Sequence, residues 1–443
     1  MKKLLLFTFA TLMAFVAGAQ TWNETFSGFA TDSRGITEIS IADANVAWAF
    51  AYDGADTSNT IRAITKTIDG GVTWTATDPI VLTGGINVGM SEIFAIDADN
   101  AWVVAYATGI GTGGLWKTTD GGANWVKKSS SSMYSNSASF PNLLYFFDAN
   151  NGFCQGDPIN GDFELYSTTD GGETWMPISG SNIENPVAGE WGYVHGYVAA
   201  GNSVWFTTSK GRLYRSTDNG ATFTAHQTPI DDFGGMVVTG HSGTFTFKDD
   251  NEGWLVGDYN DVNTLYHTTD GGVSWTPMTP TGNVFSDITY ISGAYLISVG
   301  ASSSNAGSSY STDGGATWID IDAVQHTCVS FLDINTGYSG GFSSQADNSG
   351  IFKYDAGSSI ANSKIDGLNV YPNPATAVIN ISLDKSNISN ISIYDITGQE
   401  VYSLKDLDVN QVKVNSTDFA KGIYILKVVD QNDAKQTIKL VIK

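Results

Sequence analysis

A short motif recurs six times along the chain and constrains the fold more than any other feature. Each copy reads Ser or Thr, any residue, Asp, Gly or Asn, Gly, two further residues and then Trp or Phe. Successive motif aspartates lie 43 to 52 residues apart. A period of this length with an aromatic residue at a fixed offset is typical of a β-propeller rather than of a helical solenoid. The motif aspartates are Asp69, Asp120, Asp170, Asp218, Asp270 and Asp313.

A second motif precedes most of these copies and predicts a seventh unit. It places an aromatic residue five positions after an aspartate, at Asp43, Asp97, Asp148, Asp249 and Asp333. The spacing from the last of these predicts a further copy of the first motif near residue 355. A degraded copy stands there, in which Asp355 and Gly357 keep the pattern. The sequence therefore predicts seven units.

Each unit reads as a four-stranded antiparallel meander. In the first unit, the alternation of apolar and polar residues predicts strands at 37–41, 46–52, 62–67 and 73–76. Small sheets of this kind have two apolar faces, and a ring of about seven sheets covers both faces of each. We therefore expect an all-β, seven-bladed β-propeller over residues 20–360. We also expect Thr21–Asn23 to close the ring as the outer strand of blade 7.

The first motif resembles the Asp-box, or bacterial neuraminidase repeat, found in sialidases, xyloglucan-active glycosidases, sortilin-type receptors and photosystem II stability factors. The resemblance implies that the box turns stabilise the fold and lie away from the ligand face. The carboxylate accepts backbone N–H bonds, the glycines permit positive φ, and the tryptophan packs between blades. We therefore assign the six box aspartates a structural role. We do not expect a sialidase, because the chain has only four arginines, and Arg212 and Arg215 share one strand.

We expect ligands on the face opposite the boxes. This face, called the loop face below, carries the loops between the second and third strands and the loops between blades. Asp157 and Asp258 each fall four residues after the aromatic residue of a second strand, so they occupy the same slot two blades apart. The candidates either form a ligand mouth or are solvated loop residues of an acidic protein. They are Asp157, Glu190, Trp191, His195, Asp258 and Tyr259.

The chain begins with a secretory signal. Lys2 and Lys3 precede an apolar run at 4–16, and Ala17–Ala19 is a small-x-small cleavage site. We therefore expect a signal peptide over residues 1–19, cleaved after Ala19. We find no second apolar run that approaches the length of a membrane span, so we expect no transmembrane segment in the mature chain.

The last part of the chain has a different character. Strand patterns at 368–371, 378–383, 391–395, 399–404, 422–429 and 436–442 predict a small β-sandwich over residues 368–443, after a linker at 361–367. The segment resembles the C-terminal sorting domain of type IX secretion cargo in Bacteroidetes. The motifs are Tyr371–Pro374, Ile393–Asp395 with Gly398, Lys421–Tyr424 and Lys439–Lys443. The resemblance implies type IX secretion machinery as a partner, and release or attachment at the outer-membrane cell surface. An ordinary carbohydrate-binding or immunoglobulin-like module is the alternative.

Composition narrows the function classes. The net charge of −23 disfavours nucleic acid as a partner. The two cysteines lie far apart and the five histidines show no ligand spacing, so we predict no metal site and no cofactor. We expect a non-catalytic propeller that binds a protein or glycan through the loop face. The alternative is a glycoside hydrolase, other than a sialidase, that uses carboxylates on that face.

Overall fold

The computed structural model describes residues 20–237, 239–343, 349–356, 365, 367–395, 399–405, 407–431 and 434–443. The predicted signal peptide at 1–19, most of the predicted linker and the end of the degraded seventh copy at 357–360 lie outside these residues. The chain falls into two compact units, one over Ala19–Ala356 and the other including Gly357–Lys443. Each unit is described by itself.

Within the described residues, the first unit consists of seven four-stranded antiparallel sheets, as predicted. Blades 1 to 3 contain β2 (Arg34–Ile41), β3 (Ala47–Asp53), β4 (Ala63–Thr67), β5 (Thr75–Thr77), β6 (Val88–Ala95), β7 (Ala101–Ala107), β8 (Gly114–Thr118), β9 (Val126–Lys127), β10 (Pro141–Phe146), β11 (Gly152–Ile159), β12 (Asp162–Thr168) and β13 (Met176–Pro177). The short 3₁₀ helix η1 (Gly180–Asn182) follows blade 3.

The remaining blades repeat the same order of strands. Blades 4 to 6 contain β14 (Gly192–Ala200), β15 (Ser203–Thr208), β16 (Arg212–Ser216), β17 (Thr224–Gln227), β18 (His241–Phe247), β19 (Gly253–Tyr259), β20 (Asn263–Thr268), β21 (Thr276–Pro277), β22 (Asp287–Ser292), β23 (Tyr295–Ser302), β24 (Asn305–Ser311) and β25 (Ile319–Asp322). Blade 7 contains β26 (Val329–Asp333), β27 (Thr336–Gly340), β28 (Gly350–Asp355) and β1 (Thr21–Phe26).

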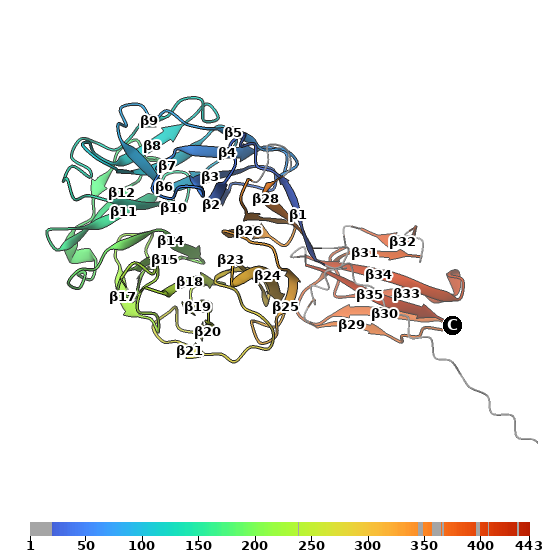
Figure 1. The fold of residues 1–443 in the computed structure, drawn as a ribbon. Helices are drawn as coiled ribbons and strands as arrows, with labels where there is room; N and C mark the ends of the chain where they lie inside the picture. Colours follow the sequence, from blue (N-terminus) through green and yellow to red (C-terminus); the bar gives the residue numbers. More distant parts are fainter. Residues whose placement is uncertain are drawn as a thin grey trace, which may run out of the picture. The chain divides into compact units, whose positions relative to one another are not determined.

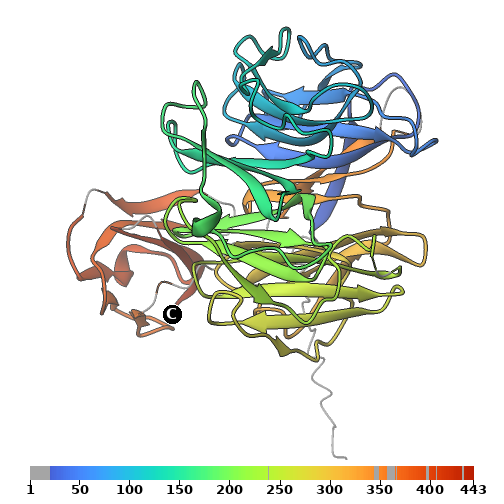
Figure 2. The ribbon, with the colours of Figure 1, turned by 90° about the vertical axis from the view of Figure 1, so that its left-hand side faces the viewer.

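The sheets follow one another around a ring (Figure 1). The first strand of each blade contacts the first strand of the next, in the order β2, β6, β10, β14, β18, β22 and β26, and β26 contacts β2 again. These strands are therefore the innermost ones and surround the centre of the ring. In Figure 2 the sheets in the green and yellow part of the chain, blades 4 to 6, are stacked face against face.

The ring is closed by the N-terminal strand, as predicted. Strand β1 pairs antiparallel with β28 from Thr21 opposite Asp355 to Phe26 opposite Gly350. The ring of Trp22 packs edge-on against Tyr354 with centroids 5.0 Å apart, and its indole N–H donates to Ser308 Oγ at 3.0 Å. The two ends of the propeller are thus joined by backbone pairing and by a half-buried tryptophan.

The two sequence motifs contact each other between blades. In blades 1 to 3 the box tryptophan packs edge-on against the second-strand aromatic of the preceding blade, as in Trp74 with Tyr338 at 5.5 Å and Trp125 with Trp48 at 6.1 Å. Both tryptophans, Trp74 and Trp125, are buried. Where this contact occurs, it links the two motifs of adjacent blades, which accounts for their shared period there.

The box turns share one hydrogen-bond pattern. In the turn around Asp170, Oδ1 accepts the backbone N–H of Thr174 at 2.9 Å and the hydroxyl of Thr168 at 2.8 Å, and Oδ2 accepts the hydroxyl of Thr174 at 2.6 Å. Gly171 and Gly172 have φ of 70° and 82°, where a side chain would be strained. The same carboxylate bonds recur at Asp69, Asp120, Asp218, Asp270 and Asp313.

The second unit is a sandwich of two sheets. One sheet has the order β29 (Leu368–Tyr371), β30 (Val378–Leu383) and β33 (Gln411–Asn415). The other has the order β32 (Glu400–Leu404), β31 (Ile388–Tyr394), β34 (Gly422–Asp430) and β35 (Lys435–Ile442), and η2 (Ser416–Asp418) follows β33. Ile381 from the first sheet and Leu426 from the second belong to one buried core. Strand β33 is absent from the strands that we predicted.

Both cysteines are free thiols, and Cys154 is buried in the core between blades 2 and 3. No helix in the part of the chain that the structure describes has the length and hydropathy of a membrane span.

Candidate functional site

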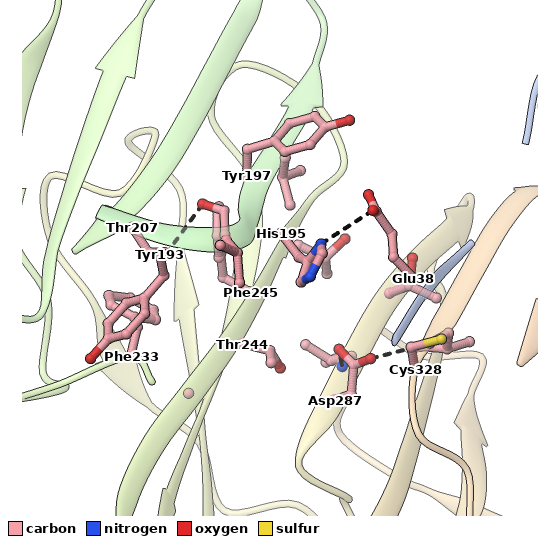
Figure 3. A pocket seen from close by; sticks show the side chains of 18 of the residues that line it. Glu38, Tyr193, His195, Tyr197, Thr207, Phe233, Thr244, Phe245, Asp287 and Cys328 are labelled. Carbon is pink, nitrogen blue, oxygen red and sulfur yellow. Dashed lines mark hydrogen bonds and ion pairs between the residues drawn. The ribbon is translucent and has the colours of Figure 1, made fainter. Parts of the chain in front are cut away.

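A cavity of about 1260 Å³ occupies the centre of the propeller (Figure 3). Its wall is formed mainly by residues of the innermost strands β2, β10, β14, β18, β22 and β26 and by loop residues beside them, and Asp157 of β11 and Thr207 of β15 also line it. Rings of Phe140, Trp191, Tyr193, Phe233 and Phe245 supply much of the apolar surface. The cavity therefore combines an aromatic wall with polar groups carried by the strands.

An irregularity in β14 makes the cavity asymmetric. Gly192 pairs with Thr208 and Tyr197 with Phe206, so extra residues of β14 bulge out of the ladder between these pairs. His195, inside the bulge, has φ of 56°, a conformation that few non-glycine residues adopt. Through the bulge, β14 contacts β6 of blade 2 in addition to its own neighbours. None of the lining residues comes from β6, although every other innermost strand contributes.

The bulge brings three ionisable groups from three blades together. His195 Nδ1 lies 3.2 Å from Glu38 Oε2 of β2 and 3.8 Å from Glu92 Oε2 of β6. Glu38 Oε2 also accepts the backbone N–H of Ile93 at 2.9 Å. The imidazole packs on the ring of Phe50, with centroids 5.1 Å apart. Figure 3 shows the histidine ring pointing toward Glu38 at the wall of the cavity.

The two carboxyl groups of this cluster differ in environment. The Glu92 side chain is 0% exposed; no hydroxyl, side-chain amide or cationic donor of the described residues reaches its oxygens, and its carboxyl group contacts that of Glu38. Burial, and then the charge of Glu38, raise the pKa of Glu92 well above its ordinary value. Burial also opposes the ionisation of Glu38, but contact with Glu92 and the charge of His195 outweigh it and lower the pKa of Glu38. Without a bound cation, Glu38 is therefore the ionised member of the pair at neutral pH.

A second acidic group lies on the wall formed by blades 6 and 7. Asp287 Oδ1 accepts the backbone N–H of Ile288 at 2.9 Å, and Oδ2 accepts that of Val329 at 3.2 Å. Burial raises the pKa of Asp287 to about 7. Burial also raises the pKa of the neighbouring Cys328 thiol, so this cysteine is a thiol rather than a thiolate at neutral pH.

Of the six loop-face residues predicted from the sequence, Asp157, Trp191 and His195 line the cavity. Asp157 Oδ1 accepts the side-chain amide of Asn142 at 2.7 Å and the backbone N–H of Gly192 at 3.0 Å. Burial raises the pKa of Asp157 to about 6. These contacts tie blade 3 to the start of β14.

The other three predicted residues do not line the cavity. Glu190 is buried, and its carboxylate pairs with Arg212 Nη1 at 2.8 Å and accepts the Thr208 hydroxyl at 2.6 Å. Asp258 Oδ1 accepts the backbone N–H of Asp261 at 2.8 Å within its own turn. The hydroxyl of Tyr259 donates to the carbonyl oxygen of Pro229 at 3.0 Å. Each of these side chains is therefore engaged in local contacts away from the cavity.

Sequence reasoning missed Glu38 and Glu92, although a signal for them exists. Each glutamate stands five residues before a turn aspartate, Glu38 before Asp43 and Glu92 before Asp97. They therefore occupy the same slot in the innermost strands of adjacent blades, where a charged residue is unusual. Their meeting with a histidine of blade 4 depends on the bulge in β14, which no spacing in the sequence reveals.

Comparison with known proteins identifies the second unit. Residues 369–443 match the family described as secretion system C-terminal sorting domain. Among curated proteins, a stretch of 75 residues is 33% identical to the endo-acting ulvan lyase of Formosa agariphila, and it covers 17% of this chain and 14% of that enzyme. This chain thus matches a small part of the length of that relative.

Two solved structures share the propeller fold. The structure of YCF48 bound to D1 peptide aligns with a TM-score of 0.53 at 15% identity, covering 79% of this chain and 99% of that chain. The structure of YCF48 from Cyanidioschyzon merolae aligns with a TM-score of 0.53 at 16% identity, covering 75% of this chain and 98% of that chain. At these identities the likeness is one of fold.

The fold and the comparisons together establish the domain architecture of the chain and imply that the protein is exported. The chain is an all-β protein in which a seven-bladed Asp-box β-propeller carries a C-terminal sorting domain of the type IX secretion system. A sorting domain of this kind implies export by the type IX machinery to a secreted or cell-surface location.

Proposed function

We propose that this chain is an exported propeller that binds an extended polypeptide segment with basic side chains in its central cavity. The observation that carries the proposal is the wall of that cavity. Aromatic rings stand there beside the carboxyl groups of Glu38, Asp157 and Asp287. Apolar surface with a few well-placed polar groups is the usual composition of a binding site.

The charge of the cavity favours a cationic ligand. The lining also includes Lys248, but its ammonium pairs with Glu252 Oε2 at 2.5 Å. The raised pKa values of Asp157 and Asp287 fall as soon as a positive group binds beside them, because an opposite charge stabilises the ionised carboxylate. The net charge of −23 adds attraction at long range, since a basic partner is steered toward an acidic protein.

The size of the cavity suits a segment of chain rather than a single small molecule. A volume of about 1260 Å³ exceeds the range of roughly 300–1,000 Å³ that is usual for small-molecule pockets. Exposed apolar groups reach its loop-face rim, where Met236 is 75% exposed. A propeller of the same fold has been solved with a bound peptide, which supports a polypeptide as the class of ligand here.

The test compares two aspartates that share one slot in different blades. The purified mature chain is screened against peptides rich in Lys and Arg, and affinity is measured by fluorescence anisotropy. Asp157→Asn keeps an oxygen for the Asn142 and Gly192 donors but removes the charge. We expect it to weaken binding about tenfold, as loss of a partly buried charge pair does. Asp258→Asn, the matched control outside the cavity, is expected to leave the affinity unchanged.

Two outcomes contradict the proposal. Equal affinity of wild type and the Asp157 variant for basic peptides would show that the peptides do not bind in the cavity. Equal binding of basic and acidic peptides would show that the negative charge of the cavity does not select the ligand.

A glycoside hydrolase is the second candidate function, favoured by the raised pKa values of two carboxyl groups in one cavity. Asp157 or Asp287 is protonated in weakly acidic solution, as a general acid must be. Glu92, although protonated, does not line the cavity and so has no path to a leaving-group oxygen. Release of reducing sugar from a polysaccharide by wild type, and its loss in Asp287→Asn with Asp258→Asn active, would favour the enzyme.

A further inference from the structure

We propose that Glu38, Glu92 and His195 form a binding site for one divalent transition-metal ion of the zinc class in the wall of the central cavity. One ligand atom from each of these side chains lies within 4.8 Å of the other two. The site does not depend on the polypeptide-binding proposal, because it rests on the geometry of the three side chains alone.

The distances suit a shared metal ion. His195 Nδ1 is 3.2 Å from an oxygen of Glu38 and 3.8 Å from an oxygen of Glu92. Bonds of about 2.0–2.2 Å, at angles between octahedral and tetrahedral, place neighbouring ligand atoms roughly 2.8–3.6 Å apart. The distance from His195 to Glu38 already lies in this range, and side-chain rotations that shorten the other two distances would bring the three atoms into one coordination shell.

The buried carboxyl group of Glu92 gives independent support. Its side chain is 0% exposed and faces the other two groups, and no hydroxyl, side-chain amide or cationic donor of the described residues satisfies its oxygens. Without a cation, the neutral carboxyl group of Glu92 contacts the carboxylate of Glu38, whereas natural proteins pair an ionised carboxylate at such a depth or use it to coordinate a metal. A cation held between Glu92 and Glu38 would satisfy both carboxylates, since two negative charges balance a divalent ion.

The site is accessible and incomplete, as a site for an exchangeable ion must be. Glu38 and His195 both line the cavity, with side chains 14% and 22% exposed, so an ion can enter from that side. Three protein ligands leave at least one coordination position for water or for a ligand in the cavity. One imidazole nitrogen with two carboxylates favours Zn²⁺, Mn²⁺ or Fe²⁺ over Ca²⁺, which takes six to eight oxygen ligands.

The alternative for the same residues is a cluster that holds a proton in place of a metal. In that arrangement Glu92 remains protonated beside ionised Glu38, and added zinc finds no competitive site. Direct metal binding distinguishes the two.

The test is titration of the full chain, untagged and freed of metal with a chelator, with ZnCl₂ in an isothermal calorimeter. We expect one equivalent of Zn²⁺ to bind, and Glu92→Gln and His195→Ala each to weaken binding at least tenfold. His267→Ala is the matched control, because His267 Nε2 also lies 3.4 Å from a carboxylate, Glu252 Oε1, but no third metal-ligating side chain joins this pair among the described residues. It is expected to bind Zn²⁺ as wild type does.

Two further measurements keep the test decisive if a variant is destabilised. Crystals soaked in ZnCl₂ should show an anomalous difference peak between Glu38, Glu92 and His195. CaCl₂ and MgCl₂ should not compete for the site at equal concentration. Zinc binding that is unchanged in both Glu92→Gln and His195→Ala, a peak elsewhere only, or equal competition by Ca²⁺ would overturn the proposal.

Discussion

Carboxyl groups in this propeller stand in two opposite electrostatic settings. The box carboxylates are surrounded by donors, and the side-chain and backbone hydrogen bonds of Thr174 lower the pKa of Asp170 to about 2. Asp287, on the cavity wall, has two backbone donors but is buried, and burial raises its pKa to about 7. The hydrogen-bonded carboxylates stabilise the fold, whereas the buried carboxyl group can ionise when a positively charged group of a ligand binds beside it.

The raised pKa of Asp287 predicts a pH-dependent stability. Between about pH 4 and pH 7 the folded chain holds a proton that the unfolded chain releases, so this group makes stability fall as pH rises through that window. Asp287→Asn imitates the protonated form. Calorimetry is expected to show similar melting temperatures for variant and wild type near pH 4, and a variant whose advantage grows as the pH rises to 7 and stays large at pH 8.

The control for this prediction is Asp231→Asn, which removes an exposed negative charge from a side chain that is 66% exposed. A difference between Asp287→Asn and wild type that is the same at both pH values would show that Asp287 does not titrate in this window.

At the scale of the element, the strands and turns followed from the sequence more closely than the site did. The predicted strand at 46–52 is β3 (Ala47–Asp53), because alternation and the flanking turn residues define it locally. Strand β33 (Gln411–Asn415) was missed although Val412 and Val414 alternate with polar residues; it is short, and its partner β30 lies far away in sequence. The bulge in β14 depends on the register with β15, which a single strand does not encode.

In the candidate site, too, some residues were predictable from the sequence and others were not. Asp157 was predictable because it follows the aromatic residue of a second strand, and Trp191 and His195 were candidates because they lie between the strands predicted for blades 3 and 4, although His195 belongs to β14. The convergence of Glu38 and Glu92 with His195 was not predictable, because it requires three blades and the bulge at once. Glu190 also looked like a free loop acid, but its partner Arg212 lies on another strand of the same blade.

The box turn supplies the prediction at this scale. Asp170→Ala removes the acceptor of three hydrogen bonds and is expected to lower the melting temperature by roughly 2–5 °C. Glu173→Ala, in the same turn, removes a carboxylate that is 56% exposed and pairs with Lys128, so it should change the melting temperature much less. Equal effects of the two substitutions in thermal unfolding would show that the box carboxylate has no special structural role.

At the scale of the whole molecule, the chain combines an export signal with a ring that offers one acidic, aromatic cavity. The sorting domain implies that the propeller works in a secreted or cell-surface location. The box turns and the tryptophans between blades stabilise the propeller, and the bulge of β14 makes its central cavity asymmetric. We infer that the loop face is the working face and that the opposite face serves the fold.

The most direct test of this account is hydrogen–deuterium exchange of the full chain with and without a bound basic peptide selected from the screen described above. The account predicts slower exchange in the segments that line the cavity, 192–200, 242–248 and 327–332, and unchanged exchange in the box turns. Protection confined to the box turns, or to residues 368–443, would contradict it.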